Sequence, residues 1–181
     1  MKTLLSLSFL FVMVTVAQAD HHESESAASP EHGVLQMDVG DWDAVIKMWM
    51  PGAPEPVMAH AVESNKMLPG GMWLLSQMEG DCGGQAFHGR GSFGFDPVTK
   101  KYVGTWVDNM SPHMMRMEGT FDDATSTMTM HAEAIDPMTG QPGKTKTETV
   151  YADGKRVMTM WKLENGEARK HMEITYTRQS S

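Results

Sequence analysis

Hydrophobic and polar positions alternate along most of the chain after Gly40, in short runs that turn residues separate. Alternation with a period of two is typical of a β-strand that has one buried face. The runs predict ten strands, approximately over Asp41–Met50, Val57–Leu68, Met72–Glu79, Gln85–Asp96, Tyr102–Asn109, Met114–Phe121, Thr127–Ile135, Thr145–Ala152, Arg156–Leu163 and Arg169–Arg178.

The separators contain the residues that tight turns require. Asp153-Gly154 and Asn165-Gly166 supply the positive φ angles of two-residue hairpins, and Pro69-Gly70-Gly71 has turn composition as well. Strands that follow one another in the sequence should therefore pair antiparallel. After Gly40 no segment has the sustained helical periodicity of a crossover between parallel strands.

These features predict an all-β fold, an antiparallel up-and-down β-barrel of eight to ten strands. Closure is expected because an open sheet of this size would leave two exposed edges. A β-sandwich is the alternative. A short N-terminal helix or irregular piece, His32–Val39, should precede the first strand.

The first residues have the pattern of a secretory signal peptide. Lys2 is followed by an apolar run from Leu4 to Val16, and then by Ala17-Gln18-Ala19. The run is shorter than the roughly 20 residues that span a bilayer, so we expect no membrane span and a periplasmic or secreted protein. The predicted organisation is a signal peptide over 1–19, a polar disordered leader over 20–31 and a barrel domain over 32–178.

Several short motifs resemble known barrel families. Val39-Gly40-Asp41-Trp42 resembles the Gly-x-Trp signature that opens the first strand of lipocalin-like barrels. The following motifs, in this order, resemble the bacterial family known as domain of unknown function 1579: His32-Gly33-Val34-Leu35, Gly89-Arg90-Gly91, Gly94-Phe95-Asp96, Lys101-Tyr102 and Trp106-Val107-Asp108. The resemblance implies a barrel related to lipocalins and fatty-acid-binding proteins, and it brings no catalytic residues.

Composition narrows the classes of partner. The formal net charge is −8, and the loss of Lys2 with the signal peptide would make it more negative, which disfavours nucleic acid as a partner. The only cysteine, Cys82, cannot form an internal disulfide. Since the sequence has no metalloprotease helix, nucleophile elbow or P-loop, we assign no catalytic residue. The cofactor and the oligomeric state stay open.

Alternation also suggests which side chains line the barrel. The side chains expected to face inward are Trp42, Ala44, Ile46 and Met48, then Tyr102, Gly104, Trp106 and Asp108, then Val157, Thr159, Trp161 and Leu163, then Met172, Ile174 and Tyr176. Glycines at 89, 91 and 104 would leave space beside Trp106. We therefore expect a small, largely apolar ligand inside, with Trp42, Met48, Tyr102, Trp106 and Trp161 as its contacts.

Methionine and histidine suggest a second class of function. The chain has 19 methionines, and His113-Met114 lies within a cluster whose thioether and imidazole groups suit Cu(I). In the alternative interpretation methionine fills a core or a cavity. Asp20-His21-His22, at the predicted mature terminus, places His22 where a free amine, backbone nitrogens and an imidazole could surround Cu(II).

A third class is an enzyme with a polar site at the barrel mouth. Carboxylates at Glu63, Glu79, Asp108 and Glu118 could meet His60, His88 or His113 there.

Overall fold

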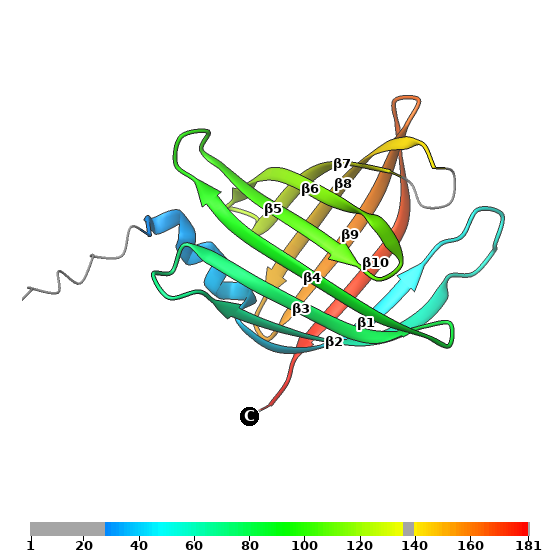
Figure 1. The fold of residues 1–181 in the computed structure, drawn as a ribbon, viewed down its shortest axis with the longest axis horizontal. Coiled ribbons are helices and arrows are strands. Elements are labelled where there is room, and N and C mark those ends of the chain that lie inside the picture. The colour runs from blue at the N-terminus through cyan, green and yellow to red at the C-terminus, as the bar shows by residue number, and fades with distance from the viewer. Residues whose placement is uncertain (1–27, 136–139, 181) are drawn as a thin grey trace, which may run out of the picture.

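Ten antiparallel strands follow one another around a closed barrel, and one short helix lies across an end of it (Figure 1). The computed structural model describes residues 28–135 and 140–180. Its elements are η1 (Pro30–Asp38), β1 (Gly40–Met48), β2 (Val57–Met67), β3 (Trp73–Cys82), β4 (Gln85–Asp96), β5 (Lys101–Asp108), β6 (Ser111–Asp122), β7 (Thr127–Ile135), β8 (Pro142–Ala152), β9 (Lys155–Glu164) and β10 (Glu167–Arg178). The predicted up-and-down barrel with a short N-terminal helix is confirmed.

Every strand pairs with its neighbours in sequence, and the first and last strands pair with each other. In this closing pair Ile46 lies opposite Ile174, and both side chains face the interior. The pairing leaves no open edge, so the sandwich alternative does not apply. Strand ends differ from the predicted ones by a few residues, as at β6, which begins at Ser111 rather than Met114.

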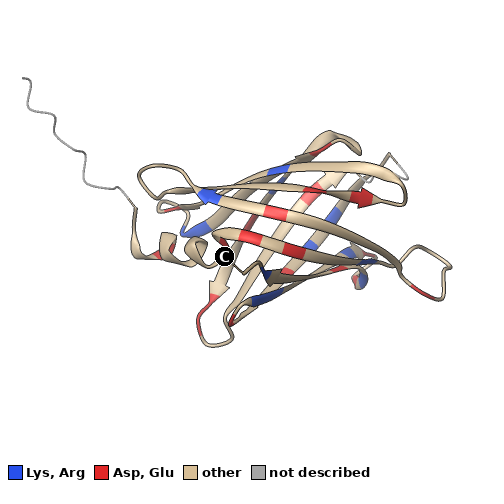
Figure 2. Cartoon of the chain, turned by 90° about the horizontal axis from the view of Figure 1, so that it is seen from below, with Lys and Arg blue, Asp and Glu red and all other residues tan. Residues whose placement is uncertain are grey.

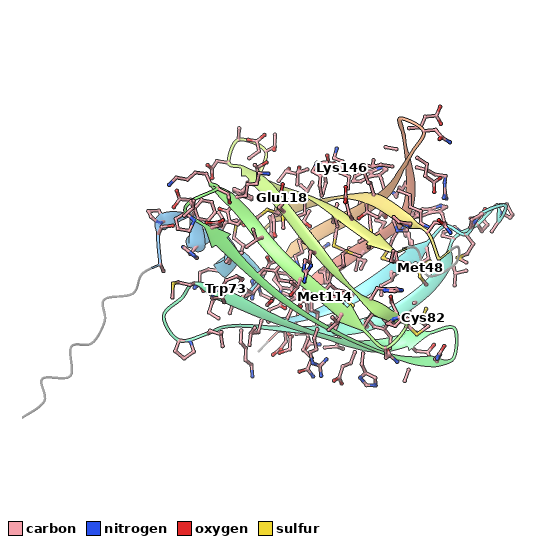
Figure 3. All side chains as sticks on the ribbon, turned by 45° about the horizontal axis from the view of Figure 1, so that its top comes forward. Met48, Trp73, Cys82, Met114, Glu118 and Lys146 are labelled. Atoms are coloured by element: carbon pink, nitrogen blue, oxygen red, sulfur yellow. The ribbon has the colours of Figure 1, made fainter. Side chains whose placement is uncertain are left out.

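The meander gives the barrel two distinct ends. One end holds η1, the start of β1 and the β2–β3, β4–β5, β6–β7 and β8–β9 turns; we call it the helix end. The other, the far end, holds the remaining hairpins, with Met48 and Cys82 close to it (Figure 3).

The helix η1 is a 3₁₀-helix that begins at Pro30 rather than at His32. Proline is favoured at the first helical position because its missing N–H would have no intrahelical partner. The preceding Ser29 N–H donates to His32 Nδ1 at 2.9 Å, which satisfies one of the free donors at this terminus. After Asp38 the chain turns into β1 through Gly40, at φ +119°, where a Cβ would lie 2.5 Å from Arg178 Nη1.

Strand side chains hold η1 against the barrel. Leu35 is buried and packs in a cluster with Leu74, Phe95, Tyr102, Met128 and Met130. Tyr102 Oη donates to the Glu31 carbonyl at 2.9 Å, and Trp42 Nε1 donates to the Asp38 carbonyl at 2.8 Å. The helix therefore closes one end of the barrel with both packing and hydrogen bonds.

Lys, Arg, Asp and Glu positions are spread over the strands and turns, with both signs interspersed (Figure 2). Cross-strand ion pairs such as Lys47–Glu173, at 3.3 Å, connect neighbouring strands. Within residues 28–135 and 140–180 no helix has the length and apolar character needed to cross a bilayer.

The predicted inward face of β9 is wrong. A regular hairpin around Asn165-Gly166 would set Thr159 opposite Met172, and both residues are among the side chains predicted to face inward. A bulge between Lys170 and Met172 shifts the register, so that Met160 lies opposite Met172. Because a shift of one residue exchanges the two faces of a strand, the inward side chains are Arg156, Met158 and Met160, and Trp161 faces outward.

Candidate ligand-binding cavity

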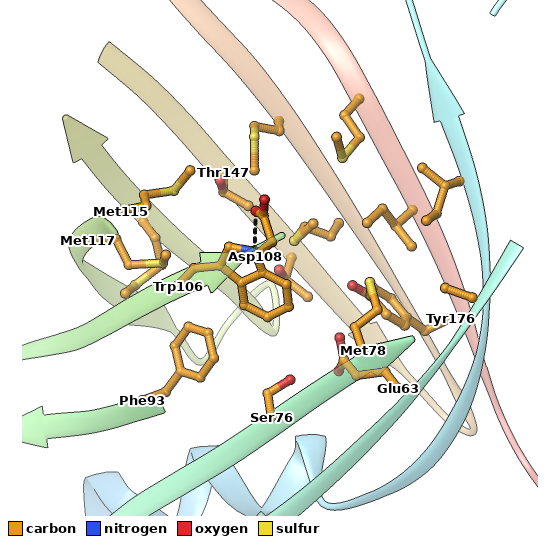
Figure 4. A pocket seen from close by; sticks show the side chains of 18 of the residues that line it. Glu63, Ser76, Met78, Phe93, Trp106, Asp108, Met115, Met117, Thr147 and Tyr176 are labelled. Atoms are coloured by element: carbon orange, nitrogen blue, oxygen red, sulfur yellow. Dashed lines mark hydrogen bonds between the residues drawn. The ribbon is translucent and has the colours of Figure 1, made fainter. Parts of the chain in front are cut away.

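The barrel encloses a cavity of about 510 Å³ (Figure 4). Its lining is mainly apolar, and much of it consists of thioether side chains. The methionines that line it are Met48, Met78, Met110, Met115, Met117, Met128, Met130, Met158, Met160 and Met172. Unbranched and polarisable side chains of this kind can adapt to ligands of irregular shape.

Trp106 forms part of the wall at mid-height, and glycines make room for its ring. A Cβ at Gly89 would lie 2.2 Å from Trp106 Cζ2, and one at Gly91 would lie 2.9 Å from Cε3. Any larger residue at these positions would displace the indole, so the space that the sequence predicted beside Trp106 is occupied by the ring itself. Trp106 Nε1 donates to Asp108 Oδ2 at 3.1 Å, which fixes its orientation.

Charged and polar side chains form the floor of the cavity, which we define as these lining residues next to η1: Asp38, Glu63, Asn65, Tyr151, Arg156 and Tyr176. Arg156 makes ion pairs with Asp38 through Nη1 and with Glu63 through Nη2. Its guanidinium carbon also lies 4.1 Å from the ring centroid of Tyr176 and 4.6 Å from that of Trp42. The cation is thus enclosed by two carboxylates and two aromatic rings.

Hydrogen bonds connect the rest of the floor. Asn65 Nδ2 donates to the Asp38 carbonyl at 3.0 Å and to Glu63 Oε1 at 2.6 Å. Tyr151 Oη donates to Asp38 Oδ2 at 3.0 Å. Since Arg156 pairs with Asp38 Oδ1, both oxygens of this carboxylate have partners. The floor therefore joins η1, β2, β8 and β9 into one polar network.

Burial shifts the pKa values of two floor residues in the directions that favour their neutral forms. Desolvation raises the pKa of Glu63 from 4.5 to about 7, against hydrogen bonds from Asn65 and Tyr176 that lower it. Desolvation also lowers the pKa of Arg156 to about 10. Both shifts oppose ionisation, so mutual contact is what stabilises the charged forms.

Three of the five side chains predicted to contact a ligand line the cavity: Met48, Tyr102 and Trp106. Trp42 is 2 % exposed but lies beneath η1, where it packs on Arg156. Trp161 lies on the outer face of β9, with Lys146 Nζ 5.4 Å from its ring centroid. The structure thus brings together three of the five and separates two.

The residues suggested for metal binding do not share one face. His113 lines the cavity near the far end, whereas Met114 points outward and is 45 % exposed. Alternation along β6 accounts for this separation. His22 lies outside the described residues. In residues 28–135 and 140–180 no group of three or more His, Cys, Asp or Glu side chains could hold a metal ion, and copper binding stays a prediction.

The carboxylates considered for an enzyme site also divide between the two faces. Glu63 and Asp108 line the cavity, whereas Glu79 lies on the outside, where its Oε1 is 3.7 Å from His88 Nδ1. Both members of that pair are about half exposed. An enzymatic role stays a prediction.

The sequence prediction did not assemble the charged floor: it named Glu63 only as a carboxylate of a site at the barrel mouth and Tyr176 only as an inward side chain, and it missed Asp38, Asn65, Tyr151 and Arg156. One signal was present on β2, where Ala59, Ala61, Glu63 and Asn65 are buried and alternate with less buried residues. Once the two alanines face inward, the glutamate and the asparagine must do so as well. No comparable signal marks Asp38, because it comes from the helix, or Arg156, because the bulge in β10 sets the face of β9.

Comparisons with known proteins agree with this architecture. No curated protein matches the chain. Among solved structures, Rv2717c from M. tuberculosis is similar in fold, with a TM-score of 0.64 and 10 % sequence identity, over 84 % of this chain and 99 % of that one. A family model described as protein of unknown function (DUF1579) matches residues 27–178, and the chain therefore belongs to this family.

Proposed function

We propose that the protein binds one small, largely apolar molecule inside its barrel. The observation that carries the proposal is the cavity of about 510 Å³ with a mainly apolar lining and a few polar groups gathered on its floor. Sites for small molecules have this size and composition, in which apolar walls provide affinity and a few polar groups fix orientation.

The ligand would enter at the far end. The helix η1 covers the opposite end and is held there by Leu35 and by the Asp38 carbonyl. At the far end the lining includes Met110, which is 41 % exposed, and the exposed His113. Solvent therefore reaches the lining from this side.

Export belongs to the same proposal. Residues 1–19 have the pattern of a signal peptide, and an exported barrel would meet its ligand outside the cytoplasm. Mass spectrometry of the exported protein should find a mature terminus at Asp20.

Titration with an uncharged hydrophobic dye tests binding inside the barrel. We expect saturable binding to the wild-type protein, and binding at least about tenfold weaker in Thr147→Trp, because Thr147 lines the cavity and an indole there would fill it. Thr177→Trp, on the exposed face of β10, is the matched control and should bind as the wild type does.

Two results would contradict the proposal. One is a wild-type protein that neither retains a ligand from extracted lipids nor binds the dye saturably. The other is equal dye affinity in the two tryptophan variants, which would place the dye on the outer surface.

A further inference from the structure

The floor of the cavity contains a cation that is already neutralised. Arg156 contacts one carboxylate of η1 and one of β2, and the three side chains are between 7 % and 13 % exposed. With Glu63 ionised the three groups carry a net negative charge, and with Glu63 protonated they are neutral. In neither state does the floor offer net positive charge to an anion, and a buried anion would need it.

Two polar atoms of the floor have no hydrogen-bond partner among the described residues. They are Asn65 Oδ1, an acceptor, and Arg156 Nε, a donor. Asn65 is 1 % exposed and Arg156 is 6 % exposed, and both line the cavity. A buried polar atom without a partner is unfavourable, so these two atoms point to a ligand group that can satisfy them.

The orientation of the Asn65 amide is fixed by its surroundings. Nδ2 donates to two oxygens, the Asp38 carbonyl and Glu63 Oε1. An amide turned by 180° would set its oxygen against both of them. Oδ1 is therefore the unpartnered atom, and it requires a hydrogen-bond donor.

The open acceptor and the open donor belong to adjacent side chains. Asn65 Nδ2 and Arg156 Nη2 both donate to the same atom, Glu63 Oε1. A hydroxyl group has one donor and two acceptor lone pairs, so it can match either atom, by donating to Oδ1 or by accepting from Nε. A carboxylate can accept from Nε, but it has no proton for Oδ1 and would approach Asp38 and Glu63 as a like charge.

We propose that the molecule bound in the barrel carries an uncharged hydroxyl group at the end that reaches the floor, and that the floor excludes carboxylates. This inference rests on the proposed function, since it assigns the head group of the same ligand. The selection separates long-chain alcohols from fatty acids of the same length.

The test is displacement of the uncharged dye by three probes that share one chain: dodecanol, dodecyl methyl ether and dodecanoate. We expect the alcohol to bind at least about tenfold more tightly than the carboxylate, with the ether between them because it cannot donate to Asn65 Oδ1. Equal or tighter binding of the carboxylate would overturn the inference. So would equal binding of the alcohol and the ether.

A charge-removing variant gives an independent result. Glu63→Gln removes one carboxylate beside Arg156, so dodecanoate should bind at least about fivefold more tightly than it does to the wild type. Glu133→Gln is the control, because this side chain is 77 % exposed on the outside. It should bind dodecanol and dodecanoate with the same ratio of affinities as the wild type. If Glu63→Gln does not fold, the order of the affinities of the three probes for the wild-type protein still tests the inference.

The two proposals fail in different ways. If neither the dye nor any of the three probes binds, the proposed function is overturned, and this inference with it. If the dye and the probes bind with the carboxylate ranked first, binding inside the barrel stands and only the hydroxyl assignment is overturned.

Discussion

At the scale of single residues, the molecule contains two kinds of ion pair. Arg156 with Asp38 and Glu63 is buried, so contact between the charges offsets a large desolvation cost and removal of one partner would leave an uncompensated charge. Glu173 with Lys47 and Lys170 lies on the outer face and is partly exposed. The outer cluster contributes less because water and salt screen it.

Glu173 should make the free energy of unfolding depend on pH in the acidic range. Hydrogen bonds from Lys170 and then Lys47 hold its pKa below the ordinary value of 4.5. A carboxyl group with a lowered pKa contributes stability above the unfolded-state value, and this contribution is lost as the pH falls through the folded-state pKa. Glu173→Gln should therefore reduce the free energy of unfolding by up to about 1 kcal/mol near neutral pH.

Urea unfolding of the wild type and Glu173→Gln, near pH 7 and again well below pH 4, measures this difference. The two proteins should have the same stability in acid. A difference that persisted undiminished there would show that lost packing, and not charge, explains the substitution.

Residue patterns in the sequence predicted some neighbours and not others. The contact of Gly89 and Gly91 with Trp106 follows from counting along two adjacent strands, and the structure confirms it. The outward position of Trp161 does not follow from the sequence, because tryptophan is as apolar as the preceding Met158 and Met160. Only the register with β10 decides which face of β9 points inward.

At the scale of elements, η1 covers one end of the barrel, so that the cavity is closed there. The predicted piece, His32–Val39, matches η1 within two residues at each end, although the helix begins at Pro30, which the prediction had assigned to the leader. Its role could not be predicted, because nothing in the local sequence shows that Asp38 meets Arg156, 118 positions further along the chain. Contacts of this separation exist only once the barrel has formed.

Leu35→Ala tests how firmly η1 is held. Leu35 is 3 % exposed, and its loss should lower the free energy of unfolding by about 2–5 kcal/mol because a cavity would remain between the helix and the strands. Chemical denaturation followed by circular dichroism measures this change. Gln36→Ala, at the exposed neighbouring position, should stay within about 0.5 kcal/mol of the wild type. Equal effects of the two substitutions would mean that η1 is not packed in solution.

At the scale of the whole molecule, the strand count, the antiparallel order and the turns were available from the sequence, because alternation and turn residues are local signals. The floor of the site was not available, because η1, β2, β8, β9 and β10 supply it from distant parts of the chain. The fold was thus more predictable than the site.

The closed barrel should unfold as one unit. Both buried clusters lie inside the same ring of strands, so neither can persist when the ring opens. We expect tryptophan fluorescence and far-UV circular dichroism to change together in urea, with a single midpoint. Two separate midpoints would show that one cluster survives the loss of the other.

Pairing of β1 with β10 also sets the order of events during folding. Lys47 and Glu173 are 126 positions apart, so the ring cannot be completed until nearly all of the barrel has been synthesised. Until then the growing sheet exposes two unpaired edges and its methionine-rich inner face, both of which favour aggregation. Nascent chains should therefore depend on chaperones until the last strand emerges from the ribosome.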